Sequence, residues 1–142
     1  QRLGVRGRPD GAGREVPPVT QALPEIRHLD EIEPAPLFDF SQKTVFSPKE
    51  RGEGFIKLAV TTGRRGARSV AHSHPRDEVT LTLRGEAVLR ACGREYHMTA
   101  GTALRLPPGV VHEVEVLSDE WVVVAAYCDE CQLCVPLHGG KA

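Results

Sequence analysis

The sequence predicts an all-β fold, either a barrel or a sandwich. Between residues 55 and 127 the chain has several segments of strand length that are rich in Val, Leu and Thr and are separated by turn residues. No segment after Phe40 keeps the apolar period of 3.6 residues that a helix of three turns would show. With 142 residues, the chain is long enough for one domain with a buried core but short for two.

Taken in order, the chain is expected to consist of an arm, a barrel and a tail. Residues 1–25 are rich in Arg, Gly and Pro and lack apolar periodicity, so we expect a flexible N-terminal arm. Residues 26–127 are expected to form the barrel, and residues 128–142 a cysteine-rich C-terminal tail. Strands are expected at Phe55–Thr61, Val79–Leu83, Ala87–Ala91, Ala103–Leu106, Val110–Leu117 and Trp121–Tyr127.

Composition argues against several classes of function. The 18 Lys and Arg residues are balanced by 19 Asp and Glu residues, so the basic excess that a nucleic-acid partner requires is missing. The longest apolar run, Trp121–Tyr127, is too short to span a membrane. The four cysteines form no framework spread over the chain, and no segment has the pattern of a secretory signal, so we expect a cytoplasmic protein. Because the chain starts at Gln1, a removed signal stays an alternative.

The stretch "AHSHPRDEVTLTLRGEA", residues 71–87, concentrates residues that bind metals. Residues two apart in a strand face the same side, so His72 and His74 point together. The turn "PRD" then allows Glu78, at the start of the next strand, to return its carboxylate to the same space. A rigid turn, "PPG", delivers His112 at the start of another strand. Imidazoles and a carboxylate form a ligand set for one divalent transition metal, which could be Fe, Mn, Ni, Cu or Zn.

These spacings resemble the two sequence motifs of the cupin superfamily. The first motif is matched by Gly66, His72, His74, Glu78 and Gly85, and the second by Gly101, Pro107, Gly109 and His112. The chain departs from the usual pattern at Val116, where asparagine is frequent, and at Thr102, where aspartate is frequent. Neither departure affects the ligand set.

The resemblance covers about residues 43–127 and implies a double-stranded β-helix, which is a jelly-roll barrel with the metal inside, frequently dimeric. It also implies that His72, His74, Glu78 and His112 bind the metal. The alternative is a metal-free cupin whose histidines only line a pocket. The presence of all four ligand residues argues against it.

Four protein ligands around an octahedral metal leave two positions open to water, substrate or dioxygen. Related cupins include dioxygenases, oxalate-degrading enzymes, sugar-phosphate isomerases and lyases. We therefore expect a metal-dependent enzyme, either a dioxygenase-like oxidoreductase or an isomerase or lyase, that acts on a small anionic or oxygen-rich substrate. The alternative is a non-catalytic small-molecule-binding or sensor module. The sequence has no helix-turn-helix pattern, which argues against that alternative.

Strand alternation predicts which side chains line the barrel. Counted from Glu78, Thr80 faces inward, whereas Val79, Leu81 and Leu83 face outward. An apolar outer face must be covered, either by the segment before residue 43 or by a second subunit, and we expect a homodimer.

Candidate substrate-binding residues are Arg68, Arg105, Thr80 and Lys57. Counting back from His72 places Arg68 on the inward side, and Arg105 lies in the strand that enters the second motif. A buried arginine requires an anion, which a substrate carboxylate or phosphate would supply. For each arginine, a position in solvent or an internal salt bridge is an equal alternative. Further candidates are Tyr96 and His97, in the strand "REYHM".

The tail spaces Cys128, Cys131 and Cys134 three residues apart, with His138 four residues further on. This spacing suits zinc, but the four donors lie within eleven residues, whereas structural zinc sites usually join two separated pairs. Free thiols, a redox disulfide and a metal shared across a dimer are the alternatives. A second metal or redox site in the tail is therefore a hypothesis.

Overall fold

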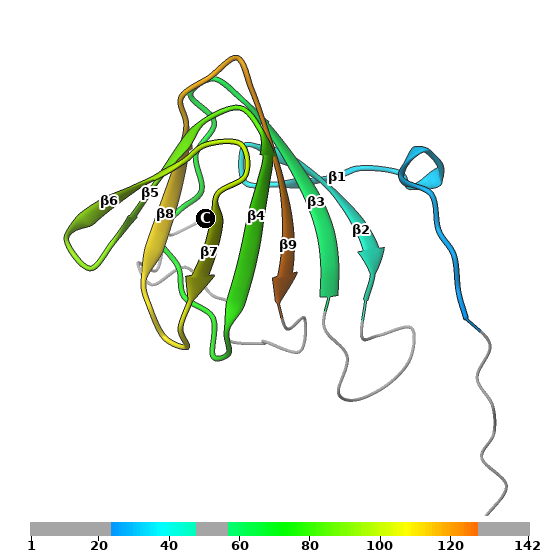
Figure 1. Ribbon diagram of the computed structural model, residues 1–142, viewed down its shortest axis with the longest axis horizontal. Helices are drawn as coiled ribbons and strands as arrows, with labels where there is room; N and C mark the ends of the chain where they lie inside the picture. Colours follow the sequence, from blue (N-terminus) through cyan, green and yellow to red (C-terminus); the bar gives the residue numbers. More distant parts are fainter. Residues whose placement is uncertain (1–23, 48–56, 128–142) are drawn as a thin grey trace, which may run out of the picture.

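The computed structural model describes residues 24–47 and 57–127, which form a jelly roll of two antiparallel sheets (Figure 1). The all-β prediction is confirmed, since the described residues contain strands and a single turn of 3-10 helix, η1 (Leu29–Glu31). The strands are β1 (Ala35–Leu37), β2 (Phe40–Phe46), β3 (Lys57–Arg64), β4 (Glu78–Arg84), β5 (Ala87–Ala91), β6 (Arg94–Met98), β7 (Ala103–Leu106), β8 (His112–Val116) and β9 (Glu120–Tyr127).

Strand order explains how distant segments come together. The larger sheet has the order β1-β2-β3-β9-β4-β7, and the smaller sheet has the order β6-β5-β8. Figure 1 shows the smaller sheet on the left and the segment with η1 projecting beyond β2 on the right. Because β9 lies between β3 and β4, the last strand joins the two halves of the larger sheet.

Alternation along each strand directs one face of each sheet into the barrel. In β4, Glu78, Thr80 and Thr82 are wholly or partly buried, whereas Val79 and Leu81 are exposed. The inward residues of β3 and β9 follow the same rule. The prediction of which β4 residues face inward and which face outward is therefore confirmed.

The core lies between the sheets at the end of the barrel where β9 begins. Phe40 from β2 and Trp121 from β9 pack edge to face, with ring centroids 6.1 Å apart. Leu89, Met98 and Val123 complete this apolar layer, and each is less than a twentieth exposed. Burial of side chains of this size contributes about 1.5–3 kcal/mol each to stability, so this layer holds the two sheets together.

Most strands begin and end close to the predicted bounds. Ala87–Ala91 and Ala103–Leu106 are reproduced without change, and the others differ by one or two residues where both ends are described. The expected start at Phe55 falls outside the described residues. β1 and β2 were not predicted, because β1 has three residues, one of them proline, and Gln42 occupies an inward position of β2 where an apolar residue would mark the pattern.

Of the expected N-terminal arm, all but the last two residues lie outside the described part of the chain, and so does the whole tail, 128–142. In the two described ranges, no helix has the length and apolar character needed to cross a membrane.

Candidate metal centre

Three histidines predicted to converge lie together inside the barrel. The ring centroid of His72 is 4.3 Å from that of His112 and 5.0 Å from that of His74. One possible ligand atom from each ring lies within 4.8 Å of the other two. The group can therefore hold a metal ion.

Backbone pairing fixes the three rings in place. His72 and His112 exchange two hydrogen bonds, with N···O distances of 3.0 and 2.9 Å, in an isolated antiparallel bridge. The Gly109 N–H, in the "PPG" turn, donates to the His74 carbonyl at 2.7 Å. Segments forty residues apart are thus joined at the point where their imidazoles meet.

Hydrogen bonds to carbonyl groups set the tautomer of two rings. Nδ1 of His72 lies 2.7 Å from the Val70 carbonyl oxygen, and Nδ1 of His112 lies 3.0 Å from that of Val110. A carbonyl only accepts, so each Nδ1 carries the proton and donates it. The neutral rings therefore present an unprotonated Nε2 to the site, as in metal-binding histidines oriented by a second hydrogen bond.

Glu78 brings a carboxylate to the same place. Its Oε2 lies 2.7 Å from Nε2 of His74 and 3.9 Å from Nε2 of His112. Burial alone would raise the pKa of Glu78, but the hydrogen bond from His74 and the nearby imidazoles outweigh it and lower the pKa. The carboxylate is therefore ionised at neutral pH.

The same burial lowers the pKa of His72 and of His112, which favours the uncharged rings. The neutral His72 and His112 rings and the ionised Glu78 carboxylate are in the protonation states that metal binding requires. The donor types, and the orientation of the His72 and His112 rings, fit one divalent transition metal.

This histidine–glutamate group faces a cavity of about 260 Å³ inside the barrel. Apolar and aromatic side chains make up much of its lining, including Phe38, Phe40, Leu89, Met98 and Trp121. Thr80 and Lys57, two of the predicted substrate-binding residues, also line the cavity. Their part in binding a substrate stays a prediction.

A polar group forms one wall of the cavity. Gln42 Nε2 donates to Thr61 Oγ1 at 3.1 Å and to the Tyr127 hydroxyl at 3.2 Å. The Tyr127 ring lies 5.6 Å from the His74 ring and 5.2 Å from the Lys57 ammonium nitrogen. Tyr127 therefore connects the histidine cluster with the lysine.

The expectation that Arg68 faces the cavity is wrong. Arg68 is exposed, and its Nη2 donates to Glu115 Oε2 at 2.8 Å. Glu115 also accepts from Arg90, and the two guanidinium groups, Arg90 first, lower its pKa. Strand alternation, counted back from His72, does not predict the direction of Arg68. Residues 65–77 form no continuous strand and pair only through isolated bridges.

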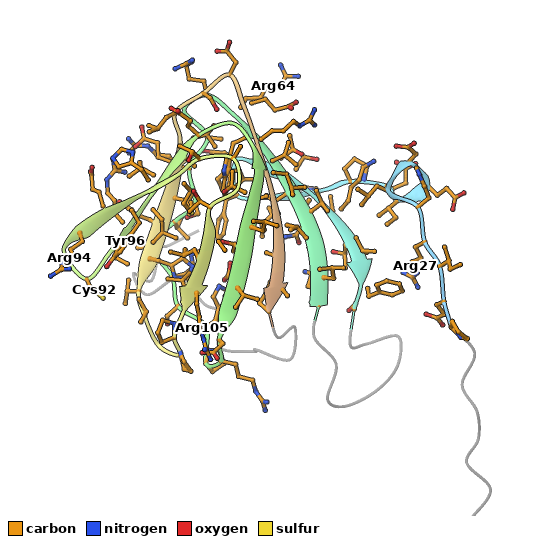
Figure 2. The ribbon with its side chains drawn as sticks, in the orientation of Figure 1. Arg27, Arg64, Cys92, Arg94, Tyr96 and Arg105 are labelled. Atoms are coloured by element: carbon orange, nitrogen blue, oxygen red, sulfur yellow. The ribbon has the colours of Figure 1, made fainter. Side chains whose placement is uncertain are left out.

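Arg105 likewise lies outside the cavity lining. It pairs with Val79 across β7 and β4, on the outer side of the sheet, and its guanidinium contacts Asp77. Figure 2 shows it at the lower end of β7. Tyr96 is exposed on β6, away from the cavity, as is His97, so these further candidates are not brought to the site either.

The second predicted site, Cys128, Cys131, Cys134 and His138, lies outside the described residues. Cys92, the remaining cysteine, is an exposed free thiol in the turn between β5 and β6 (Figure 2). Sequence reasoning missed Gln42 and Tyr127 as lining residues. Strand parity could have found Tyr127, which is separated from Trp121 by an even number of residues and so faces the same side.

The comparisons with known proteins agree with the barrel fold. The model of a known family described as "Cupin domain" matches residues 60–129. A Cupin 2 conserved barrel domain protein from Salinispora arenicola superposes with a TM-score of 0.64 at 24% identity, over 77% of this chain and 92% of the other. No curated protein sequence is significantly similar to the chain.

Two further structures of similar fold carry names that suggest different activities. A predicted oxalate decarboxylase from Thermotoga maritima has a TM-score of 0.66 at 18% identity, over 73% of this chain and 98% of its own. The polyketide cyclase RemF from Streptomyces resistomycificus has a TM-score of 0.65 at 16% identity, over 75% and 81%. At these identities the likeness concerns the fold alone.

Proposed function

Because the chain belongs to the cupin superfamily, we propose that it is a metal-dependent enzyme acting on a small molecule, with His72, His74, Glu78 and His112 as ligands of one divalent transition metal. The convergence of three imidazoles beside an ionised carboxylate, on the wall of an internal cavity, carries this proposal. A cytoplasmic location is part of it and rests on the sequence features given above.

The chain's own residues would perform two tasks, and the metal a third. The carbonyl groups of Val70 and Val110 keep the His72 and His112 rings in the tautomer that leaves Nε2 free to bind. The apolar lining would limit contact with water and so strengthen polar interactions within the cavity. The metal would act as a Lewis acid or would activate dioxygen at its open positions.

The alternative is a non-catalytic small-molecule-binding module that uses the same cavity. Four protein ligands on an octahedral ion leave two positions open, and a small molecule could bind there with or without being converted. Both dioxygenase-like chemistry and metal-assisted isomerisation or lysis are compatible with those positions.

Metal content tests the proposal directly. The full chain is purified without added metal and analysed for metal equivalents per chain. We expect His72→Gln and His112→Gln each to hold about one equivalent less than the wild type, since loss of a ligand typically reduces affinity by orders of magnitude. His97→Gln, on the exposed strand β6, is the matched control and should hold as much metal as the wild type. A wild-type protein without metal, or ligand variants with the full wild-type metal content, would contradict the proposal.

A second measurement separates the reaction classes. The Fe(II)-loaded protein is supplied with candidate substrates in an oxygen electrode. Consumption of oxygen matching loss of substrate indicates oxygenase chemistry, and loss of substrate without oxygen consumption indicates an isomerase or lyase. If no substrate is converted by any loaded form while ligands still bind, the non-catalytic module is favoured.

A further inference from the structure

We propose that the side chain of Phe38 is a gate at the mouth of the cavity and determines, by size, which molecules reach the histidine–glutamate group. This goes beyond the proposed function, which assigns the ligands of a metal but not the route to them. The inference does not require a bound metal. It rests on the place of Phe38 in the cavity wall, on its backbone conformation and on its contact with His72.

Phe38 lies where the cavity meets solvent. It lines the cavity and is 42% exposed, which makes it the most exposed of the described residues in the lining. A residue that belongs to a cavity wall and is also in contact with solvent lies at an opening. The Phe38 ring centroid is 5.3 Å from that of His72. A molecule that enters past this ring therefore comes directly to the histidines.

The backbone at this position is unfavourable for phenylalanine. Phe38 is the first residue of the two-residue turn that joins β1 to β2, and its φ is +52°, in the left-handed region. A bulky side chain rarely adopts this conformation, whereas glycine does so without strain. Strained residues of this kind cluster at functional sites. Here the function is the position of the ring at the cavity mouth.

A second strained residue provides a comparison away from the cavity. Cys92 has a φ of +53°, and it and Phe38 are the non-glycine residues with positive φ in the described ranges. With Gly93, at +69°, Cys92 forms the turn between β5 and β6, outside the cavity lining (Figure 2). Two consecutive positive φ values are those of a common hairpin turn. Phe38 therefore differs from Cys92 in having a large ring beside the histidines.

The residues that follow Phe38 are held in place. Asp39 Oδ2 accepts from the Arg68 backbone N–H at 3.0 Å, which ties the turn to the segment that precedes the histidines. Phe40 packs against Trp121 in the core, with ring centroids 6.1 Å apart. Opening therefore requires only rotation of the Phe38 ring about its side-chain bonds, which is a fast motion for an exposed residue. The ring can move without disturbing the core.

Trp121 reports on entry into the cavity. It is the single tryptophan of the sequence, lines the cavity and is 4% exposed. Quenching of its fluorescence by acrylamide, a small neutral molecule, is measured on the full chain without metal. We expect the quenching constant to rise about threefold or more in Phe38→Gly and in Phe38→Ala, because no ring then closes the mouth. Phe38→Tyr, which keeps a ring, should resemble the wild type.

Two comparisons separate the ring from the backbone. Phe38→Gly should unfold at a higher urea concentration than Phe38→Ala, because glycine adopts a positive φ without strain, yet both should be quenched equally. Cys92→Gly is the matched control, since it relieves the same backbone conformation outside the cavity lining. It should leave quenching unchanged. Succinimide, a larger neutral quencher, should gain more from loss of the Phe38 ring than acrylamide does.

Metal release links the gate to the proposed function. Protein loaded with Zn(II) is mixed with excess EDTA, and the rate of metal loss is measured. Release should be about fivefold faster or more in Phe38→Gly than in the wild type, because water and chelator reach the His72 side of the site more easily. Cys92→Gly should release metal at the wild-type rate.

The outcomes distinguish this inference from the proposed function. Quenching that is unchanged in both Phe38→Gly and Phe38→Ala, or that rises equally in Cys92→Gly, overturns the inference even if the wild type binds metal. An equal gain for both quenchers, or metal release that is unchanged in Phe38→Gly, overturns it as well. Quenching that depends on the Phe38 ring in a protein that never binds metal supports the inference and contradicts the proposed function.

Discussion

Two threonines on the inward face of β4 have opposite hydrogen-bonding states. Thr82 is 1% exposed, and its Oγ1 accepts from the Trp121 indole Nε1 at 3.3 Å. Thr80, two residues earlier, buries an Oγ1 that has no partner in the described residues. A buried hydroxyl without a partner lowers stability, whereas a paired one contributes to it.

Valine substitutions should therefore shift stability in opposite directions. We expect Thr80→Val to raise the free energy of unfolding of the metal-free protein by about 1 kcal/mol, because it removes an unpaired polar group. Thr82→Val should lower it by about 1–2 kcal/mol, because it leaves the indole N–H without an acceptor. Urea denaturation measures both as shifts of the midpoint at constant m. Equal losses in the two variants would show that Thr80 Oγ1 is satisfied after all.

The buried histidines predict how the metal-free protein responds to acid. Because burial lowers the pKa of His72 and of His112 below the ordinary value near 6.5, the unfolded chain takes up protons first as pH falls. The free energy of unfolding should therefore decline from about pH 6.5 downward. The lowered pKa of Glu78 continues the decline below about pH 4.5.

Thermal unfolding of chelator-treated protein at pH 7, 6 and 5 measures this decline. The double variant His72→Gln, His112→Gln should be much less sensitive to pH over this interval, whereas His97→Gln should behave as the wild type. A wild-type melting temperature that stays constant between pH 7 and pH 5 would contradict the assignment of neutral buried rings.

The site residues that sequence predicted well are those whose placement depends on local geometry. His72, His74 and Glu78 are fixed by a short span, and His112 follows a rigid turn, so spacing alone indicated that they meet. Arg68 was misplaced because strand parity was extended into a segment that is not a strand. Gln42 was missed because its place in the cavity depends on the pairing of β2 with β3, which no local pattern encodes.

At the scale of elements, the turn between β4 and β5 depends on Gly85. Its φ is +78°, in the left-handed region, and a Cβ added there would lie 1.9 Å from the Glu120 carbonyl oxygen. Gly66 has a similar φ of +83° but open space around it. The two glycines therefore share the backbone requirement and differ in the steric one.

Alanine at each position separates these contributions. Gly66→Ala should lower the free energy of unfolding by about 1 kcal/mol, the scale of left-handed strain alone. Gly85→Ala should cause a loss larger by at least about 2 kcal/mol, because β4 or β9 must shift to relieve the contact with Glu120. Chemical denaturation measures both. Similar losses would mean that the backbone near Glu120 moves aside easily.

Turn glycines of this kind explain why β5 and β7 were predicted with correct bounds. Glycines with positive φ at 85, 93, 101 and 109 lie in the turns around the strands from β4 to β8. These turns can be recognised in the sequence because glycine is the residue that most readily adopts a positive φ. Among the described residues, no glycine with positive φ lies next to β1 or β2. β1 is stabilised by its pairing with β2, since it has only three residues of its own.

For the molecule as a whole, the outer face of the larger sheet is the main unexplained surface. Val79, Leu81 and Leu83 of β4 are 45%, 40% and 46% exposed. The described strands of the segment before residue 43 do not cover them, because β1 and β2 lie on the far side of β3 and β9 (Figure 1). A second subunit is the sequence-based explanation that we develop for this apolar face.

Charge favours a second copy of this chain as the occupant. β9 lies next to β4, and β3 lies next to β9. The outward residues of these two strands include Val124, Leu58 and Val60, so the centre of the face has no ionisable group. At its borders, Arg105 contacts Asp77, Arg84 pairs with Glu120 at 3.4 Å, and Lys43 Nζ donates to the Leu29 carbonyl oxygen. An uncharged apolar face matches its own image across a twofold axis without opposing like charges.

We therefore expect the wild type to be a homodimer with twice the chain mass of 15.5 kDa. Leu81→Lys places a charge at the centre of the face, and because the position is 40% exposed in one chain, the monomer should still fold. In the dimer the same ammonium group would be buried opposite its symmetry mate, which is strongly unfavourable, so the variant should be monomeric. Light scattering after size exclusion measures the mass. Tyr96→Lys, at a position 39% exposed on β6 of the other sheet, should leave the dimer intact, and a wild-type monomer at high micromolar concentration would rule out this interface.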